Sequence, residues 1–173
     1  EAIWDNLLFA SGKLNKTMYG IPFVPPLDDQ ELLGNYKYWP VSTPDESYRR
    51  AIYLMLRRSF RFPMLRAFDL PDNTASCGRR DITSVPNQAL TLLNNSLVNE
   101  LADEFAKRLL DETDGSPPEL AKRAWQIAYN RPITKTERKM TIEFLSGEPV
   151  GKVERLKELC LAIFNTNEFI YLP

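Results

Sequence analysis

The sequence predicts a mainly α-helical fold, a compact multi-helix domain with an arginine-rich, irregular centre. Apolar residues recur at helical spacing through much of the second half of the chain, and helix-start signals precede several of these stretches. In the centre, the segment between Arg49 and Arg80 has eight arginines and no lysine, with only Asp69 and Asp72 as acidic residues. We expect residues 1–173 to form one domain, the C-terminal portion of a larger multidomain polypeptide.

Length and charge limit the classes of function. The chain has 173 residues with 22 basic and 23 acidic side chains, so it carries almost no net charge. A nucleic-acid-binding protein needs a surplus of positive charge together with stacking aromatics, and we therefore predict no nucleic-acid partner. The chain has no apolar run of the roughly 20 residues that a membrane-spanning helix requires.

Histidine is absent from the chain, which removes Ser-His and Cys-His nucleophile pairs, haem ligation by histidine and most zinc sites. The two cysteines, Cys77 and Cys160, lie far apart in sequence and form neither a metal-ligand spacing nor a redox pair. They form either one disulfide or two separately buried thiols. We predict no metal and no cofactor in this segment.

The first part of the chain reads as a helix followed by an extended crossover. Over residues 1–11 the apolar side chains fall on one side, and Gly12 stands where a helix stops. The helical pattern is already present at the first residue, so we expect the polypeptide to continue N-terminally. Three prolines in residues 20–26 hold the chain extended there.

Residues 36–58 allow two interpretations. Tyrosine and tryptophan alternate over residues 36–41, which favours a short β-hairpin with residues 48–58. A helix competes, because Thr43-Pro44-Asp45-Glu46 has the pattern of a capping box with proline at the first helical position. The residues alone do not decide between strand and helix for residues 48–58.

A loop-rich connection and then a series of helices follow. Residues 63–86 have few periodic apolar positions, so polar side chains must order this backbone. After it we expect helices over residues 88–93 and 97–110. Ser116-Pro117-Pro118-Glu119 and Thr134-Lys135-Thr136-Glu137 read as capping boxes that open two more helices, the second ending at Leu145, and residues 153–164 form the last.

The arginine-rich centre is the candidate site. Arginine is preferred over lysine where a planar group must hold a carboxylate, phosphate or sulfate by two parallel hydrogen bonds. The cluster either binds an anion such as an acidic polysaccharide or locks its own loops, with the arginines converging on Asp69 and Asp72. Its candidate members are Arg49, Arg50, Arg57, Arg58, Asp69, Asp72, Arg79, Arg80, Gln88 and Asn94.

A catalytic role for this cluster is weakly supported. Glycoside hydrolysis by paired carboxylates needs no histidine, and Asp69 and Asp72 are the only candidates in a polar centre. Surrounding arginines would lower the pKa of both carboxyls, which is the wrong direction for a general acid. We therefore predict no catalytic residue in this segment. The alternative is a composite hydrolase or redox site that missing N-terminal residues complete.

Several stretches together resemble a known family. They are Ser11-Gly12-Lys13-Leu14, residues 48–59, Phe68-Asp69-Leu70-Pro71-Asp72, Cys77-Gly78-Arg79-Arg80, residues 86–95, Arg131-Pro132-Ile133-Thr134 with Glu137, and residues 164–169. In this order they resemble the C-terminal part of the planctomycete-specific domain of unknown function that follows planctomycete cytochrome c-type domains. The resemblance covers nearly the whole chain.

This resemblance implies an exported, extracytoplasmic bacterial polypeptide with several domains, often with a haem-attachment domain elsewhere in the polypeptide and sometimes with carbohydrate-binding-like modules. It raises the expectation of a disulfide between Cys77 and Cys160, and it implies no catalytic residue. The expected function is a non-catalytic binding or scaffolding module. Its expected partners are neighbouring domains of the same polypeptide and an acidic polysaccharide.

Overall fold

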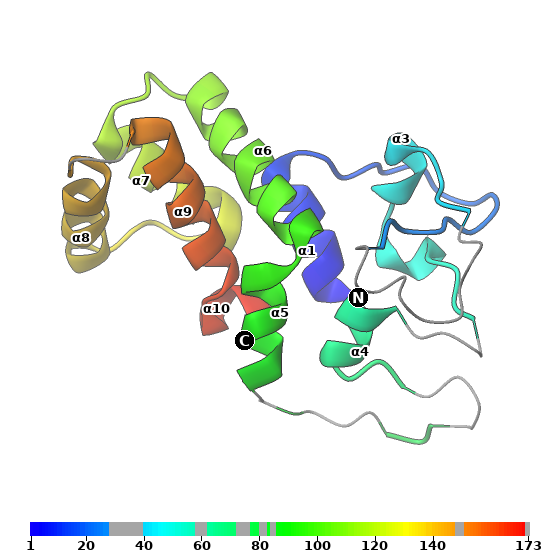
Figure 1. Cartoon of the computed structure of the whole chain (residues 1–173). Coiled ribbons are helices and arrows are strands. Elements are labelled where there is room, and N and C mark those ends of the chain that lie inside the picture. Colours follow the sequence, from blue (N-terminus) through cyan, green and yellow to red (C-terminus); the bar gives the residue numbers. More distant parts are fainter. Residues whose placement is uncertain are drawn as a thin grey trace. The chain divides into compact units, whose positions relative to one another are not determined.

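A computed structural model of the chain confirms the mainly helical fold (Figure 1). It describes residues 1–27, 40–57, 62–71, 77–79, 83, 86–147 and 151–171. The helices are α1 (Ala2–Ser11), α3 (Pro44–Ser47), α4 (Pro63–Ala67), α5 (Pro86–Asn94), α6 (Ser96–Glu112), α7 (Pro117–Tyr129), α8 (Lys135–Leu145), α9 (Lys152–Phe164) and α10 (Asn167–Ile170), with a 3₁₀ turn η1 (Ala51–Tyr53). None of the helices described combines the length and the apolarity that crossing a membrane demands.

The chain forms two compact units. The first contains residues 1–5 and 14–96, and the second contains residues 6–13 and 97–173. Helix α1 therefore gives its first residues to one unit and its remaining residues to the other. The expectation that residues 1–173 act as one domain stays a prediction.

The first unit is built around the indole ring of Trp4, which is only 1% exposed. Its ring stacks on Phe23 with the centroids 6.0 Å apart and meets the ring of Phe62 edge-on at 5.7 Å. The indole N–H donates to the Arg49 carbonyl at 3.0 Å, so the polar end of the buried ring is satisfied. In the same unit α4 packs against α5.

Residues 48–57 form neither the long helix nor a regular strand. The capping box at Thr43 is confirmed, but the helix that it opens, α3, ends at Ser47. The chain then pairs with the proline-rich crossover: Phe23 donates to the Tyr53 carbonyl at 2.9 Å, and Met55 donates to the Phe23 carbonyl at 2.8 Å. The pairing consists of isolated parallel bridges, and the proposed partner strand at residues 36–39 lies outside the described residues.

The loop-rich connection over residues 63–86 is more ordered at its start than predicted. Its first residues form the short helix α4, with proline at the first turn. Met64 and Leu65 of this helix are buried, so apolar contacts order the backbone here and polar side chains are not needed for it. The expectation of an irregular connection from its first residue was wrong.

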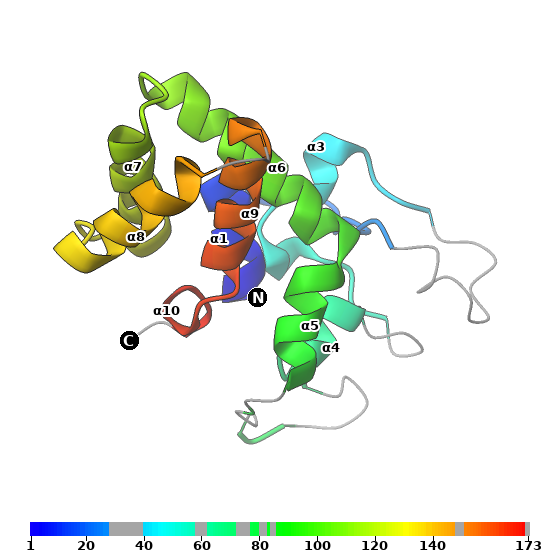
Figure 2. The same cartoon turned by 60° about the vertical axis from the view of Figure 1, so that its left-hand side comes forward.

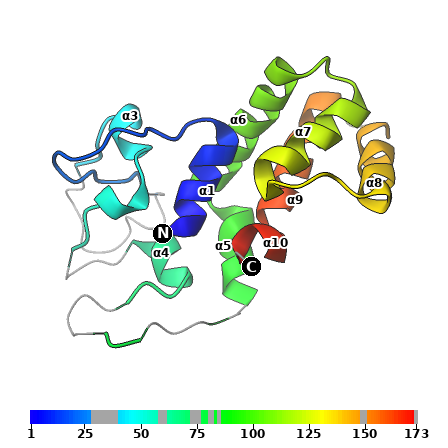
Figure 3. The same cartoon turned by 180° about the vertical axis from the view of Figure 1, so that it is seen from behind.

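The second unit packs five helices and the end of α1 around an aromatic core. Helix α7 packs against α8, α8 packs against α9, and α10 contacts both α7 and α9 (Figures 2 and 3). The rings of Phe105 on α6 and Phe164 on α9 stack with centroids 5.7 Å apart, and Phe169 of α10 lies 5.0 Å from Phe164. This aromatic column joins α6 to α9 and α10, which lie about 50 residues further along the chain.

Two of the helix details differ from the predictions. The Thr134–Glu137 capping box is confirmed, but Ser116 and Glu119 form none. The Ser116 N–H instead donates to Asp114 Oδ1 at 2.8 Å, and Glu119 pairs with Lys122 at 3.3 Å. On α9, the predicted apolar stripe is buried except at Val153, which is 60% exposed in the first turn.

Replacing Phe164 by alanine should destabilise the second unit strongly. The side chain is fully buried between two other rings, so truncation leaves a cavity, and we expect a loss of about 3–5 kcal/mol in the free energy of unfolding. Phe144→Ala is the matched control, because the Phe144 ring is 39% exposed, and it should cost under about 1 kcal/mol. Urea unfolding of both variants provides the measurement, and equal losses would contradict the described core.

Candidate functional site

Arg49, from the predicted cluster, is a structural clamp. Its side chain is buried, with the residue only 6% exposed, and its guanidinium lies 4.2 Å from the centroid of the Tyr53 ring. Nε donates to the Thr17 carbonyl at 3.3 Å, Nη1 to the Ile21 carbonyl at 3.0 Å, and Nη2 to the Tyr19 carbonyl. The planar donor fork therefore binds the backbone of residues 17–21, and no exogenous anion is needed to satisfy it.

Arg50 and Asp69 also have partners other than those predicted. Arg50 Nε binds Asp5 Oδ2 at 2.9 Å, and the other oxygen of Asp5 accepts from the Ala51 N–H at 2.7 Å. Asp69 accepts from the backbone N–H and the hydroxyl of Thr83, both at 2.8 Å. The predicted convergence of Arg49 and Arg50 on Asp69 is wrong, because nearer acceptors on residues 5 and 17–21 bind these guanidinium groups.

The other predicted members of the cluster differ in burial. Arg57 is half-buried, Arg79 and Asn94 are exposed, and Gln88 is buried. Gln88 Nε2 donates to the Thr83 carbonyl at 3.0 Å, so Asp69 and Gln88 meet through Thr83. Arg58, Asp72 and Arg80 lie outside the described residues.

Both cysteines are free thiols. The expectation of two buried thiols holds for Cys160, whose pKa is raised by burial, but Cys77 is exposed. The Cys77 thiol donates to the Arg79 carbonyl at 3.0 Å. Within the part of the chain that the structure describes, no three His, Cys, Asp or Glu side chains gather as a metal-binding group.

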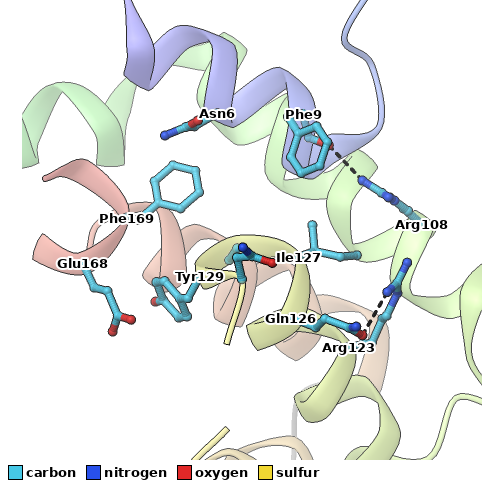
Figure 4. A pocket seen from close by; sticks show the side chains of 11 residues that line it. Asn6, Phe9, Arg108, Arg123, Gln126, Ile127, Tyr129, Glu168 and Phe169 are labelled. Atoms are coloured by element: carbon cyan, nitrogen blue, oxygen red, sulfur yellow. Dashed lines mark hydrogen bonds between the residues drawn. The ribbon is translucent and has the colours of Figure 1, made fainter. Parts of the chain in front are cut away.

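A hollow in the second unit is the better candidate for a binding site. It has a volume of about 560 Å³, within the range of ligand-binding pockets, and elements α1, α6, α7 and α10 contribute to its walls (Figure 4). The lining residues are Asn6, Phe9, Arg108, Arg123, Gln126, Ile127, Ala128, Tyr129, Asn130, Glu168 and Phe169.

One rim of this hollow is fixed by Arg108 and Arg123, which share the carboxylate of Glu112. Arg108 Nε lies 2.7 Å from Oε1, and Arg123 Nη2 lies 2.6 Å from Oε2. Arg108 Nη1 also donates to the Phe9 and Ala10 carbonyls at 2.8 and 3.1 Å, at the C-terminal end of α1. The Arg108 hydrogen bond, followed by that of Arg123, lowers the pKa of Glu112, so this carboxylate is ionised at neutral pH.

Gly12 makes room for this arrangement. Its φ of +77° favours glycine, and a Cβ there would lie only 3.2 Å from Arg108 Cδ. The glycine that the sequence pattern assigned to the end of the first helix thus also allows Arg108 to reach the Phe9 and Ala10 carbonyls at the C-terminal end of α1.

The opposite rim is fixed by Arg131, which binds two carboxylates. Nη2 lies 2.6 Å from Glu137 Oε1, and Nε lies 2.6 Å from Glu168 Oε1. Each carboxylate accepts a second bond from the same guanidinium, at 3.0 and 2.7 Å. These bonds raise the pKa of Arg131 and lower those of Glu137 and Glu168.

Tyr129 completes this rim beside Arg131. The Arg131 guanidinium lies 5.4 Å from the centroid of the Tyr129 ring, and the Tyr129 hydroxyl is 2.9 Å from Thr166 Oγ1. Burial raises the pKa of Tyr129, so the phenol remains neutral. The ring and Glu168 are thereby held in the wall of the hollow.

The groups that face the hollow are suited to binding and not to acid–base catalysis. The Phe9 ring is 50% exposed, and Asn6, Gln126 and Asn130 present carboxamides. Glu168 is the only carboxylate among the described lining residues, and Arg131 lowers its pKa, so Glu168 does not hold a proton to donate near neutral pH.

Sequence reasoning missed this site. Ile127 and Ala128 are apolar residues of α7, yet they line the hollow and do not belong to the buried core. Two of the stretches that carry the family resemblance did point to this site. The first contains Arg131 and Glu137, the second contains Glu168, and both carboxylates bind the Arg131 guanidinium. Phe9 and Gln126 had no such signal, because an exposed side chain on a helix fits any solvated face.

The comparisons with known proteins identify a family without a known function. Residues 1–145 match the family model described as PSD1: Protein of unknown function (DUF1553). No curated protein and no solved structure matches the chain. The matched residues include α7 and most of the lining of the hollow.

We predict that Arg49→Ala costs about 3 kcal/mol in the free energy of unfolding. The substitution removes a buried guanidinium together with its three hydrogen bonds to the carbonyls of residues 17–21. Arg50→Ala is the matched control one residue away: it removes an ion pair whose arginine side chain is 54% exposed, and should cost under about 1 kcal/mol. Urea unfolding tests the pair, and a larger loss for Arg50→Ala would contradict the clamp.

We also predict a specific acid sensitivity. The pKa values of Glu137 and Glu168 are lowered in the folded state by Arg131, so the stabilisation is present above the unfolded glutamate pKa of about 4.3 and is lost as the pH falls below it. Arg131→Gln should flatten this acid limb. Unfolding free energies measured from about pH 6 to pH 3 give the slope. Arg138→Gln, at an exposed position on α8, should keep the wild-type slope, and an unchanged slope in Arg131→Gln would contradict the pairing.

Proposed function

Because this chain belongs to the PSD1 family of proteins of unknown function, we propose its function from its own site: it is a non-catalytic module that binds carbohydrate. The observation that carries the proposal is the lining of the hollow in the second unit, where a half-exposed phenylalanine ring stands among three carboxamides. This is the chemistry that a sugar ring, apolar on its faces and hydroxylated at its edges, would require.

The carboxamides supply the polar half of the site. Each offers both a donor and an acceptor, as a sugar hydroxyl does, so one side chain can pair with a hydroxyl in either direction. Gln126 Oε1 accepts from Arg123 Nη1 at 3.0 Å, which orients the side chain and leaves its NH₂ group for a ligand. Figure 4 shows Gln126 beside Arg123 in the wall of the hollow.

The aromatic half of the site comes from Phe9 and Tyr129. The C–H groups of a sugar face carry partial positive charge and pack favourably against the negative face of an aromatic ring. The Arg108 guanidinium lies 6.0 Å from the Phe9 centroid, and its bonds to the Phe9 and Ala10 carbonyls fix the helix end that bears the ring. The site is therefore preorganised, which lowers the entropic cost of binding.

The ion pairs that the arginines already form favour a neutral sugar as the ligand. The number of arginines in the sequence had suggested an acidic polysaccharide. Arg108 and Arg123 share Glu112, and Arg131 binds Glu137 and Glu168, so the guanidinium groups around the hollow already have carboxylate partners. An acidic ligand would have to compete with these partners. A neutral, hydroxylated ligand leaves the pairs intact.

The cellular setting belongs to the same proposal. We propose that the module works in an exported, extracytoplasmic polypeptide next to other domains, including one that carries haem. Its role there is to hold the polypeptide to a polysaccharide. The support is the family resemblance together with the binding chemistry of the hollow.

The proposal predicts measurable binding to neutral glycans. A glycan array, followed by calorimetric titration with the best neutral and best acidic glycans at low and raised salt, should show neutral-glycan binding that salt barely changes. Phe9→Ala should weaken it at least about tenfold, which is 1.4 kcal/mol. Phe144→Ala, which removes a partly exposed ring on α8, should leave the affinity unchanged.

Two results would overturn this function. One is the absence of binding to every neutral glycan on the array. The other is binding that Phe9→Ala and Phe144→Ala affect equally, since a site at the hollow involves only the first of these rings.

A further inference from the structure

We propose that the site is extended and takes the ligand as a chain, with several sugar units bound side by side along α7. The inference rests on the proposed function and deepens it. Two more hollows, of about 370 and 300 Å³, adjoin the one of about 560 Å³ in the second unit. They are named here the first, second and third hollows in order of decreasing volume.

The three hollows share lining residues, and all of the shared residues belong to one face of α7 and its cap. Gln126 lines all three. Arg123 lines the first and second, Lys122 the second and third, and Asn130 the first and third. A ligand that occupies one hollow therefore contacts a side chain that also borders the next.

The spacing of these residues follows the helix. Lys122, Gln126 and Asn130 stand four residues apart, so they fall along one face, while Leu120, Ala121, Ala124 and Trp125 on the other face are buried. Eight residues at a rise of 1.5 Å place the ends of this row about 12 Å apart. The row is longer than a single sugar ring.

The end of the row is formed by an unusual residue. Asn130 caps α7 with φ 53° and ψ 31°, the left-handed conformation in which glycine is the common choice. Asparagine tolerates this conformation better than most residues and, unlike glycine, places a carboxamide at the border of two hollows. Its side chain has no hydrogen-bond partner among the described residues and is available to a ligand.

The second and third hollows are lined almost entirely by polar groups. The second has Glu112, Thr113, Asp114, Glu119, Lys122, Arg123 and Gln126, and the third adds only Pro132 as an apolar residue. A bound peptide normally anchors by apolar side chains in apolar pockets. A hydroxylated chain needs no such anchors beyond an aromatic ring, so a glycan fits these linings better than a peptide does.

The charges along the row are also compensated. Lys122 Nζ pairs with Glu119 at 3.3 Å, and the Asp114 carboxylate accepts the Ser116 N–H at 2.8 Å. Taken together, the three linings contain four carboxylates and four cationic side chains, so the row as a whole has no surplus of either sign. The chain that occupies them is neutral.

The test is a chain-length series on the whole 173-residue protein. Calorimetric titrations with neutral cello-, malto- and manno-oligosaccharides, from monosaccharide to hexasaccharide, should show an affinity that rises with length. We expect the tetrasaccharide of the preferred series to bind at least about tenfold tighter than its monosaccharide, a gain of 1.4 kcal/mol. An extended-peptide library serves as the comparison ligand.

Two variants show which residues produce the gain in affinity with chain length. Lys122→Ala should leave monosaccharide affinity unchanged and remove most of the gain with length, because Lys122 lines only the second and third hollows. Asn130→Gly should keep the fold, since glycine suits the left-handed cap, and should weaken binding of the longer chains. Lys139→Ala, at an exposed position on α8, is the matched control and should change nothing.

The outcomes separate the two claims. Binding that does not depend on length, or a gain with length that Lys122→Ala leaves intact, overturns the extended site and leaves the carbohydrate-binding function standing. Absence of binding by every sugar series overturns the function itself and this inference with it. Peptide binding that Lys122→Ala abolishes, without glycan binding, assigns the same row of hollows to a different ligand and overturns both.

Discussion

The candidate site depends on a single guanidinium bound to two carboxylates. Arg131 follows α7, Glu137 lies in the first turn of α8, and Glu168 belongs to α10, so one side chain joins three helical elements. Tyr129 and Glu168 form a wall of the first hollow, and both contact this guanidinium. The planarity of arginine matters here, because its rigid fork of donors gives each of the two carboxylates a pair of hydrogen bonds.

The planar fork of donors also explains how the arginines elsewhere in the chain bind. Their acceptors differ from those expected. Arg49 binds three carbonyls of residues 17–21, Arg108 binds the last carbonyls of α1, and Arg155 Nη1 binds the Phe144 carbonyl at 2.9 Å near the end of α8. The carbonyls at the ends of α1 and α8 also carry the partial negative charge of a helix C-terminus. Arginine thus binds backbone carbonyls of this chain, and its frequency in a sequence does not by itself indicate an anionic ligand.

Features that depend on residues close together in sequence could be predicted, and features that depend on residues far apart in sequence could not. The helices of the second unit were predictable because apolar periodicity and the Thr134–Glu137 cap are local signals. The acceptors of Arg49 could not be predicted. They lie 28 to 32 residues away, and they are backbone carbonyls, which every residue type has. Both the helix and the hairpin interpretation of residues 48–57 failed, because backbone hydrogen bonds to Phe23, in a distant crossover, determine the conformation of this segment. The first hollow was missed because the side chains that form it come from four separate elements.

The central claim is that ligands bind on the exposed face of α7 and not on the arginine-rich centre. It is tested most directly by recording the side-chain amide NMR signals of the chain while a binding glycan is added. The account predicts that the carboxamide signals of Gln126 and Asn130 shift first and saturably, while those of Gln88 and Asn94 stay in place. Shifts confined to Gln88, Asn94 and the arginines of residues 49–79 would contradict it.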